Sequence, residues 1–263
     1  MSDVTHAPGK FCWAELLTTD AAAAKAFYGA LLGLEFRDDP MPEGGAYTMM
    51  SIADGHVGGM WQIDDAMKQQ GVVSHWMSYV SVADVDATVA KARELGGVVT
   101  REPFDVMEFG RMATFQDPSK ALLSVWQAGT HHGFGHAEPR AGTVCWNELA
   151  SHNIDLCGSF YAKLFAWSPK VQDMGGSTYT IFKSGEDMRA GMMAMDGDDY
   201  KDIPSHWNLY FMVEDCLRSV AKARELGATV RVPPTQIPNM GRFSIMSDPT
   251  GAVFSVVDSY TGE

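Results

Sequence analysis

The feature that most constrains the fold is an internal repeat. Residues 74–97 and 205–228 are identical at 14 of 24 positions, at an offset of 131 residues. The similarity extends in both directions, because segments 11–33 and 110–126 resemble segments 144–166 and 241–257. Such self-similarity indicates that one structural module occurs twice. We therefore predict two modules, residues 1–127 and 143–263, joined by a solvated Gly- and His-rich linker over residues 128–142.

Within each module, the pattern predicts two units with the element order β-α-β-β-β. In the first unit, a strand precedes Asp20, which is a plausible N-cap, and Gly33 lies where the Ala-rich helix should end. Turn signals at Asp54-Gly55 and Asp117-Pro118 predict two hairpins. We expect an α+β fold in which each module has a curved mixed sheet. Helices would cover one face of the sheet, and the other face would form a cup.

Composition restricts the partners and the location. Hydrophobic residues make up 46% of the chain, which is enough for a sizeable core, and the net charge of −13 disfavours nucleic acid as a partner. No apolar run approaches the roughly 20 residues of a membrane span. The N-terminus lacks a secretory pattern, and the four cysteines form no CxxC pair. We expect a cytoplasmic protein with a small-molecule partner, either a monomer with an internal pseudo-dimer or a homodimer.

Three motifs carry a resemblance to a known family. They are TTDAAAAKAFYGALLGLEF at 18–36, VADVDATVAKARELGG at 82–97 and DPSKALLSVWQ at 117–127. With them, the chain resembles the glyoxalase, bleomycin-resistance and extradiol dioxygenase superfamily, also called vicinal oxygen chelate proteins. The resemblance covers nearly the whole chain twice and implies a fold of tandem βαβββ modules. It does not specify an activity, because this fold hosts isomerases, dioxygenases and non-catalytic drug-binding proteins.

The resemblance also implies where a divalent metal would be held. The family uses His or Gln on the first strand, His on the fifth and Glu on the eighth. Aligned by motif, these positions hold neither imidazole nor carboxylate in either module, the ligands that such metals prefer. They are Trp13, Met77 and Ser124 in the first module and Trp146, Asn208 and Ser255 in the second. We predict no metal and no other cofactor at this centre.

Strand alternation predicts what lines the cups instead. Side chains two residues apart lie on the same face of a strand, so the neighbours of the metal positions should share the concave face. An aromatic pocket with a few polar groups is typical of a small-molecule site. The predicted ligand-binding residues are Trp13, Tyr79 and Ser124 in the first cup and Trp146, Asn208, Tyr210 and Ser255 in the second. Trp76 and Trp207 are out of phase and should face the helices.

Charged residues recur at matched positions of the two modules. Glu15 with His75, and Glu148 with His206, are candidate catalytic pairs that would transfer a proton. Alternatively, each pair neutralises a buried carboxylate, or its members make independent contacts.

Two matched arginines lie near strand ends. Arg111 and Arg242, in matching GR dipeptides, would bind a ligand carboxylate at the rim of each cup, unless they are exposed or structurally paired.

Three classes of function remain open. The first is a metal-dependent enzyme, a glyoxalase-like lyase or isomerase or a ring-cleaving dioxygenase. The second is a non-catalytic protein that sequesters a small molecule. The third is a metal-free enzyme that uses Glu and His. The residues favour a protein that binds or acts on a small organic molecule in a Trp-lined cup, without the usual metal triad.

Overall fold

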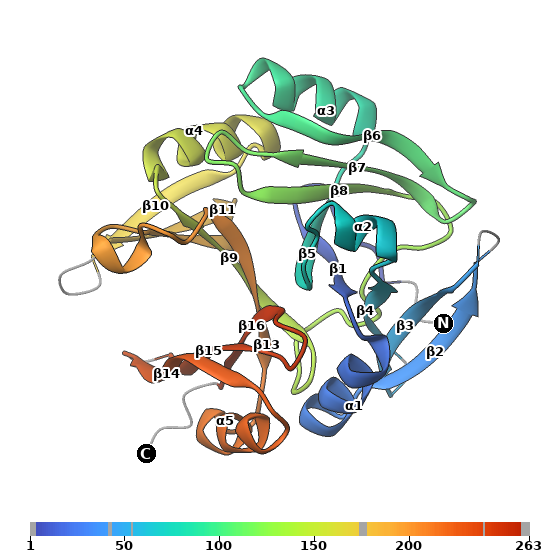
Figure 1. Ribbon diagram of the computed structural model, residues 1–263. Coiled ribbons are helices and arrows are strands. Elements are labelled where there is room, and N and C mark those ends of the chain that lie inside the picture. The colour runs from blue at the N-terminus through green and yellow to red at the C-terminus, as the bar shows by residue number, and fades with distance from the viewer. Residues whose placement is uncertain (1–3, 42–43, 54, 174–177, 239, 259–263) are drawn as a thin grey trace.

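Two eight-stranded mixed sheets form the protein, one in each module (Figure 1). The computed structural model describes residues 4–41, 44–53, 55–173, 178–238 and 240–258. The first sheet has the order β2-β3-β4-β1-β5-β8-β7-β6. Its strands are β1 (Phe11–Thr18), β2 (Glu35–Pro40), β3 (Ala46–Ile52), β4 (Gly55–Gln62), β5 (His75–Ser81), β6 (Val98–Val106), β7 (Gly110–Gln116) and β8 (Leu122–Ala128). Asp54 of the predicted hairpin lies outside the described residues.

The second sheet repeats the first strand for strand, with the order β10-β11-β12-β9-β13-β16-β15-β14. Its strands are β9 (Val144–Ser151), β10 (Ser168–Asp173), β11 (Thr178–Ser184), β12 (Asp187–Ala194), β13 (His206–Met212), β14 (Thr229–Ile237), β15 (Gly241–Ser247) and β16 (Val253–Val257). The duplication predicted from the repeat is therefore confirmed, and the fold is α+β with paired βαβββ units.

One long helix follows the first strand of each unit, as predicted. The helices are α1 (Ala21–Leu32), α3 (Val85–Glu94), α4 (Ile154–Phe165) and α5 (Cys216–Glu225), with a short α2 (Asp65–Gln69) and a 3-10 turn η1 (Asp198–Tyr200) at the matched place. Asp20 caps α1 by accepting a hydrogen bond from the Ala23 amide, and Gly33 ends it with a left-handed φ of 72°. Asp84 and Asp215 cap α3 and α5 in the same way.

The helices bury their apolar faces between the two modules. One core cluster joins α1 and the β1–β4 half of the first sheet to α5 and the β13–β16 half of the second. A second cluster joins α3 and the β5–β8 half to α4 and the β9–β12 half. Each helix layer thus contributes to a core that both modules share. The opposite face of each sheet is left to form a cup.

Two matched hydrogen-bond chains cross between the modules. Trp76 donates to the Tyr28 hydroxyl at 2.9 Å, which donates to Asp248 of the other module at 2.9 Å. Trp207 makes the corresponding chain through Tyr161 to Asp117, at 2.8 and 3.0 Å. The two tryptophans therefore face the helices, as strand phase predicted, and the DP turns join the modules.

Within the part of the chain that the structure describes, no helix is both long enough and apolar enough to cross a membrane.

Candidate functional site: two matched cups

The central strands bring the predicted residues of each cup together. In the first sheet, Trp13 on β1 lies opposite Tyr79 on β5, which lies beside Ser124 on β8. In the second, Trp146, Tyr210 and Ser255 occupy the same row on β9, β13 and β16. Trp13 and Tyr79 pack in a cluster separate from the two inter-module cores. Strand alternation thus predicted the concave face correctly, whereas the ligand-binding role of these residues stays a prediction.

A buried carboxylate in the first cup is held by tyrosines. The Tyr79 hydroxyl donates to Glu15 Oε2 at 3.0 Å, and Tyr47 on β3 also hydrogen-bonds the carboxylate. The indole of Trp13 donates to the Tyr47 hydroxyl at 3.0 Å. The chain Trp–Tyr–Glu–Tyr therefore spans β1, β3 and β5.

The second cup repeats this chain with shorter contacts to the carboxylate. Tyr179 donates to Glu148 Oε2 at 2.7 Å, and Tyr210 donates to Glu148 Oε1 at 2.8 Å. The Trp146 indole donates to the Tyr179 hydroxyl at 3.0 Å. Glu148 is only 8% exposed, and a tyrosine hydroxyl hydrogen-bonds each of its two oxygens.

A glycine beside each network gives the tyrosine its place. A Cβ on Gly59 would lie 1.8 Å from the Tyr47 hydroxyl, and a Cβ on Gly191 would lie 1.7 Å from the Tyr179 hydroxyl. Any larger residue would displace the hydroxyl from the Glu and the Trp. On β4, Gly59 pairs with Glu15 of β1, and on β12, Gly191 pairs with Glu148 of β9. The space that each tyrosine hydroxyl needs explains why glycine recurs at this position.

Burial makes both carboxyl groups weaker acids than an exposed Glu. It raises the pKa of Glu15 and of Glu148, although hydrogen bonds from the tyrosines favour the charged form in each case. Burial, followed by the charge of Glu148, raises the pKa of Tyr210 well above its ordinary value. Each cup therefore presents a carboxyl group that takes up a proton more readily than an exposed Glu.

The histidines of the predicted pairs bond elsewhere. The His75 ring contacts the Val73 carbonyl at 2.7 Å, and the His206 ring contacts the Pro204 carbonyl at 2.8 Å. Among the described residues, no hydrogen bond or ion pair joins Glu15 to His75 or Glu148 to His206. The strand register explains this, because His75 pairs with Leu17 while Glu15 pairs with Met77. A catalytic role for these four residues stays a prediction.

The two cups differ in their central polar groups. Ser124 is fully buried and bonds the Thr114 hydroxyl at 2.8 Å. Ser255 instead accepts a hydrogen bond from Asn208 Nδ2 at 2.6 Å. The first cup cannot form this bond, because Met77 stands at the position of Asn208. Asn208 is 5% exposed. Its Oδ1 is one of only two buried side-chain nitrogen or oxygen atoms in the described chain that have no hydrogen-bond partner.

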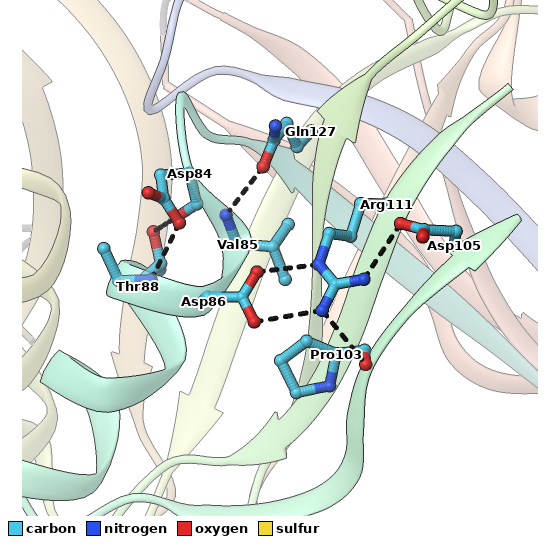
Figure 2. A network of polar contacts seen from close by, with 9 residues as sticks. Asp84, Val85, Asp86, Thr88, Pro103, Asp105, Arg111 and Gln127 are labelled. Atoms are coloured by element: carbon cyan, nitrogen blue, oxygen red, sulfur yellow. Dashed lines mark hydrogen bonds and ion pairs between the residues drawn. The ribbon is translucent and has the colours of Figure 1, made fainter. Parts of the chain in front are cut away.

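Arg111 on β7 forms ion pairs that connect α3 to β6. Its guanidinium bonds Asp86 at the start of α3 at 2.7 Å and Asp105 on β6 at 2.9 Å (Figure 2). These carboxylates occupy the donors that a ligand carboxylate would need, so the structurally paired alternative describes Arg111. Arg242 is exposed at the start of β15, where its backbone amide donates to Asp258 at 2.6 Å. Its role as a carboxylate clamp stays a prediction.

The linker covers the first cup instead of being a wholly solvated loop. His131 meets the Trp13 ring edge to face at a centroid distance of 4.5 Å, and its carbonyl accepts a hydrogen bond from Trp126 at 3.0 Å. Phe134 packs against Trp13 at 5.9 Å. The pKa of His131 falls to about 4, mainly through burial, so the ring that caps the cup is neutral. Trp13 is consequently only 6% exposed.

The second cup has no such cover among the described residues. Its tryptophan, Trp146, is half-buried, as are Phe243, Ile245 and Val257 on β15 and β16. Their counterparts in the first cup include Met112 and Trp126, which are both 7% exposed. The second cup therefore offers an accessible aromatic wall beside Glu148 and Asn208, while the first is filled by side chains.

Four residues of the cups were absent from the sequence predictions. Tyr47 and Tyr179 recur in the matched segments AYT and TYT, so their repetition was a usable signal. His131 and Phe134 left no such signal, because the path of the linker depends on tertiary packing.

The donor groups in the cups do not fit a transition-metal centre. No group of three His, Cys, Asp or Glu side chains suited to a metal occurs within the described ranges. The carboxylate of each cup lies on the first strand rather than the eighth, and it is held by tyrosines. At the positions where the family holds metal, the first module has an indole, a thioether and a hydroxyl.

Tandem modules of paired βαβββ units define the class of fold, and comparison with known proteins identifies the family. Residues 10–125 match the model of the Glyoxalase/Bleomycin resistance protein/Dioxygenase superfamily, and residues 144–257 match that of the Glyoxalase-like domain. The chain belongs to this superfamily. It is 36% identical to the "Putative glyoxylase CFP32" of Mycobacterium tuberculosis, over 93% of each chain. It is 32% identical to the anthracycline biosynthesis protein DnrV of Streptomyces peucetius, over 97% of this chain and 95% of that protein.

Solved structures share the fold at low sequence identity. The Mn(II)-bound glyoxalase from Novosphingobium aromaticivorans is 17% identical, with a TM-score of 0.64 over 95% of this chain and 82% of its own. The 2,3-dioxygenase LapB from Pseudomonas sp. KL28 is 16% identical, with a TM-score of 0.65 over 98% of this chain and 94% of its own. These similarities establish the architecture and not an activity.

Proposed function

We propose that the protein binds a small planar organic molecule in the second cup, without a metal. The observation that carries this proposal is the unpartnered Oδ1 of Asn208, which is buried beside Ser255 on the strand next to that of the half-buried Trp146. A buried acceptor without a partner costs free energy, which a ligand hydroxyl or N–H group would recover. Trp146 supplies a face for an aromatic ring. The names of the relatives from anthracycline biosynthesis support a small organic ligand.

The test compares 2-naphthol with its methyl ether, 2-methoxynaphthalene, which lacks the donor. Binding of either compound is measured by the quenching of tryptophan fluorescence. We expect the naphthol to bind about tenfold or more tightly, as a buried hydrogen bond predicts. Asn208→Met, which copies Met77 of the first cup, should remove the preference. Equal affinities for both compounds, or an unchanged preference in the variant, would reject the proposal.

A second candidate function is proton transfer by Glu148, favoured by the raised pKa of its buried carboxyl group. The ionised form would accept a proton from an acidic C–H of a bound ketone, exchange that proton with solvent, and deliver a solvent-derived proton to the same carbon. 2-Tetralone in D₂O tests this by NMR, because each such cycle exchanges an α-proton for deuterium. Glu148→Gln should slow enzyme-dependent exchange by about 10²- to 10⁴-fold.

His206→Gln separates the Glu–His pair from Glu148 alone. An effect as large as that of Glu148→Gln would support the pair, despite the separate hydrogen bonds of the two residues. No enzyme-dependent exchange in the unaltered protein would leave sequestration as the function.

Absence of the usual metal is part of the proposal. Because the residues at the family positions lack imidazole and carboxylate groups, we expect purified protein to hold well under one equivalent of Zn, Fe, Ni or Mn. Elemental analysis after purification without chelator measures this. The expectation would be contradicted if the protein held one equivalent of such a metal and if a chelator removed both the metal and ligand binding.

A further inference from the structure

A pocket lies between the modules, and Trp146 of the second cup is among the residues that line it. Its volume is about 670 Å³, and it is bounded by the N-terminal segment, the starts of β4 and β12, the linker and the start of β9. Phe11, Phe134 and Val144 supply apolar wall. Lys10 and Arg189 supply positive charge within a chain whose net charge is −13.

The repeat shows why this space is open. In the first module, the linker fills the matched position: the Phe134 amide donates to the Cys12 carbonyl at 2.8 Å, and the Gly135 amide donates to the His56 carbonyl at 2.9 Å. The second-module counterparts of Cys12 and His56 are Cys145 and Met188, and both line the pocket. The pocket therefore occupies the place where the first module binds its own chain.

Arg189 gives the pocket its chemistry. Its counterpart, Val57, is a core residue at 2% exposure, so a buried cation replaces an apolar side chain. The Arg189 side chain is 8% exposed, and Asp187 pairs with its Nη2 at 3.3 Å. Its Nε is buried without a hydrogen-bond partner, the second such atom in the described chain. An acceptor from a ligand would satisfy this donor.

The two cations of the pocket are matched in number by two carboxylates, so its attraction for an anion rests on the donors of Lys10 and Arg189 Nε that no carboxylate engages, not on net charge. Lys10 makes no ion pair among the described residues, while Asp187 is committed to Arg189 and Glu138 is exposed. Three histidines also line the pocket, and burial is the main cause that lowers the pKa of each, so they contribute polar nitrogens rather than charge near neutral pH. They are His6, His56 and His136.

We propose that this inter-module pocket binds a small organic carboxylate with an apolar body. Arg189 Nε and Lys10 bind the carboxylate, and Phe11, Phe134 and Val144 contact the body. The site takes a ligand of different charge from that proposed for the second cup. It shares Trp146 with that cup, whereas Asn208 and Ser255 do not line it.

Calorimetric titration with 2-naphthoate tests the proposal, with uncharged 2-naphthamide as the matched ligand. We expect the carboxylate to bind at least about tenfold more tightly than the amide. Arg189→Met should weaken 2-naphthoate binding by about ten- to a hundredfold, as loss of a hydrogen bond to a charged group predicts. Methionine should be tolerated because the first module has an apolar residue there. Lys10→Gln, at a partly exposed position, should weaken binding about two- to fivefold.

Three controls distinguish binding in this pocket from binding in the second cup and from general attraction of anions. Arg218→Gln removes an exposed arginine of α5 outside the pocket and should leave the affinity for 2-naphthoate unchanged. Asn208→Met should also leave it unchanged, whether or not the second cup binds 2-naphthol. Inorganic phosphate should compete only weakly, because it lacks the apolar body. Equal binding of acid and amide, unchanged affinity in Arg189→Met, or equal competition by phosphate would overturn the proposal.

Discussion

The two cups have the same carboxylate network and opposite accessibility. In the first, His131 and Phe134 cover Trp13, and Met77 fills the centre. In the second, Trp146 is half-buried, and Asn208 replaces the methionine with an unsatisfied acceptor. Duplication therefore preserved the Trp–Tyr–Glu–Tyr chain while the surroundings diverged. The shared chain is best explained as part of the scaffold of each cup, and the differences indicate which cup takes a ligand.

The largest expected contrast comes from replacing each tryptophan. Trp13→Ala removes a buried ring that packs against His131 and Phe134, so the free energy of unfolding should fall by about 3–5 kcal/mol. Trp146→Ala should cost about 1–2 kcal/mol, because that ring is already partly exposed. Affinity for 2-naphthol should change in the reverse order, with the greater loss in Trp146→Ala. Urea unfolding and fluorescence titration measure the two quantities, and equal stability losses would contradict the contrast.

The linker covers the first cup, so shortening a linker side chain should make the two cups more alike in accessibility. Phe134→Ala should remove apolar cover from the first cup and lower the free energy of unfolding by about 2 kcal/mol. It should also expose Trp13 to acrylamide, which quenches accessible indole fluorescence. Performing the experiment in a Trp146→Phe background reduces the contribution of the second cup. Unchanged quenching would mean that the linker does not control access to Trp13.

The sequence predicted the scaffold better than the networks within it. The repeat, the Asp caps and strand alternation together predicted the modules, the helices and the concave position of Trp13 and Tyr79. The Glu15–His75 pairing assumed that adjacent strands bring the two side chains together, but the register offsets them by two residues along the strands. The bond between Tyr47 and Glu15 crosses β4 at a glycine. Such contacts depend on strand order and backbone proximity, which a residue pattern does not specify.

Exchanging the central residues, Asn208 and Met77, should change the free energy of unfolding by a smaller amount. Asn208→Met should raise the free energy of unfolding by about 1 kcal/mol, because it removes a buried unsatisfied acceptor and copies the first cup. The reciprocal Met77→Asn should destabilise the protein, since it introduces a polar group into the apolar cluster around Trp13. Differential unfolding in urea measures both variants. Destabilisation by Asn208→Met would show that the hydrogen bond from Asn208 to Ser255 outweighs the cost of the unpartnered Oδ1.

The smallest effect expected is a change in pH dependence. Burial raises the pKa of Glu148 in the folded protein above its ordinary value of 4.5, so the folded state holds this proton more tightly than the unfolded state does. Its contribution to stability is therefore most favourable at low pH and declines as pH rises through the folded-state pKa. Glu148→Gln removes this titration, so the difference in unfolding free energy between the variant and the unaltered protein should shift in favour of the variant as pH rises from about 4.5. Glu15→Gln is the matched variant in the covered cup and should shift in the same direction, because burial is the largest cause there too. Chemical unfolding at a series of pH values measures both differences. A shift in the opposite direction would show that the tyrosine hydrogen bonds outweigh burial, and that the carboxylates are held in their charged form.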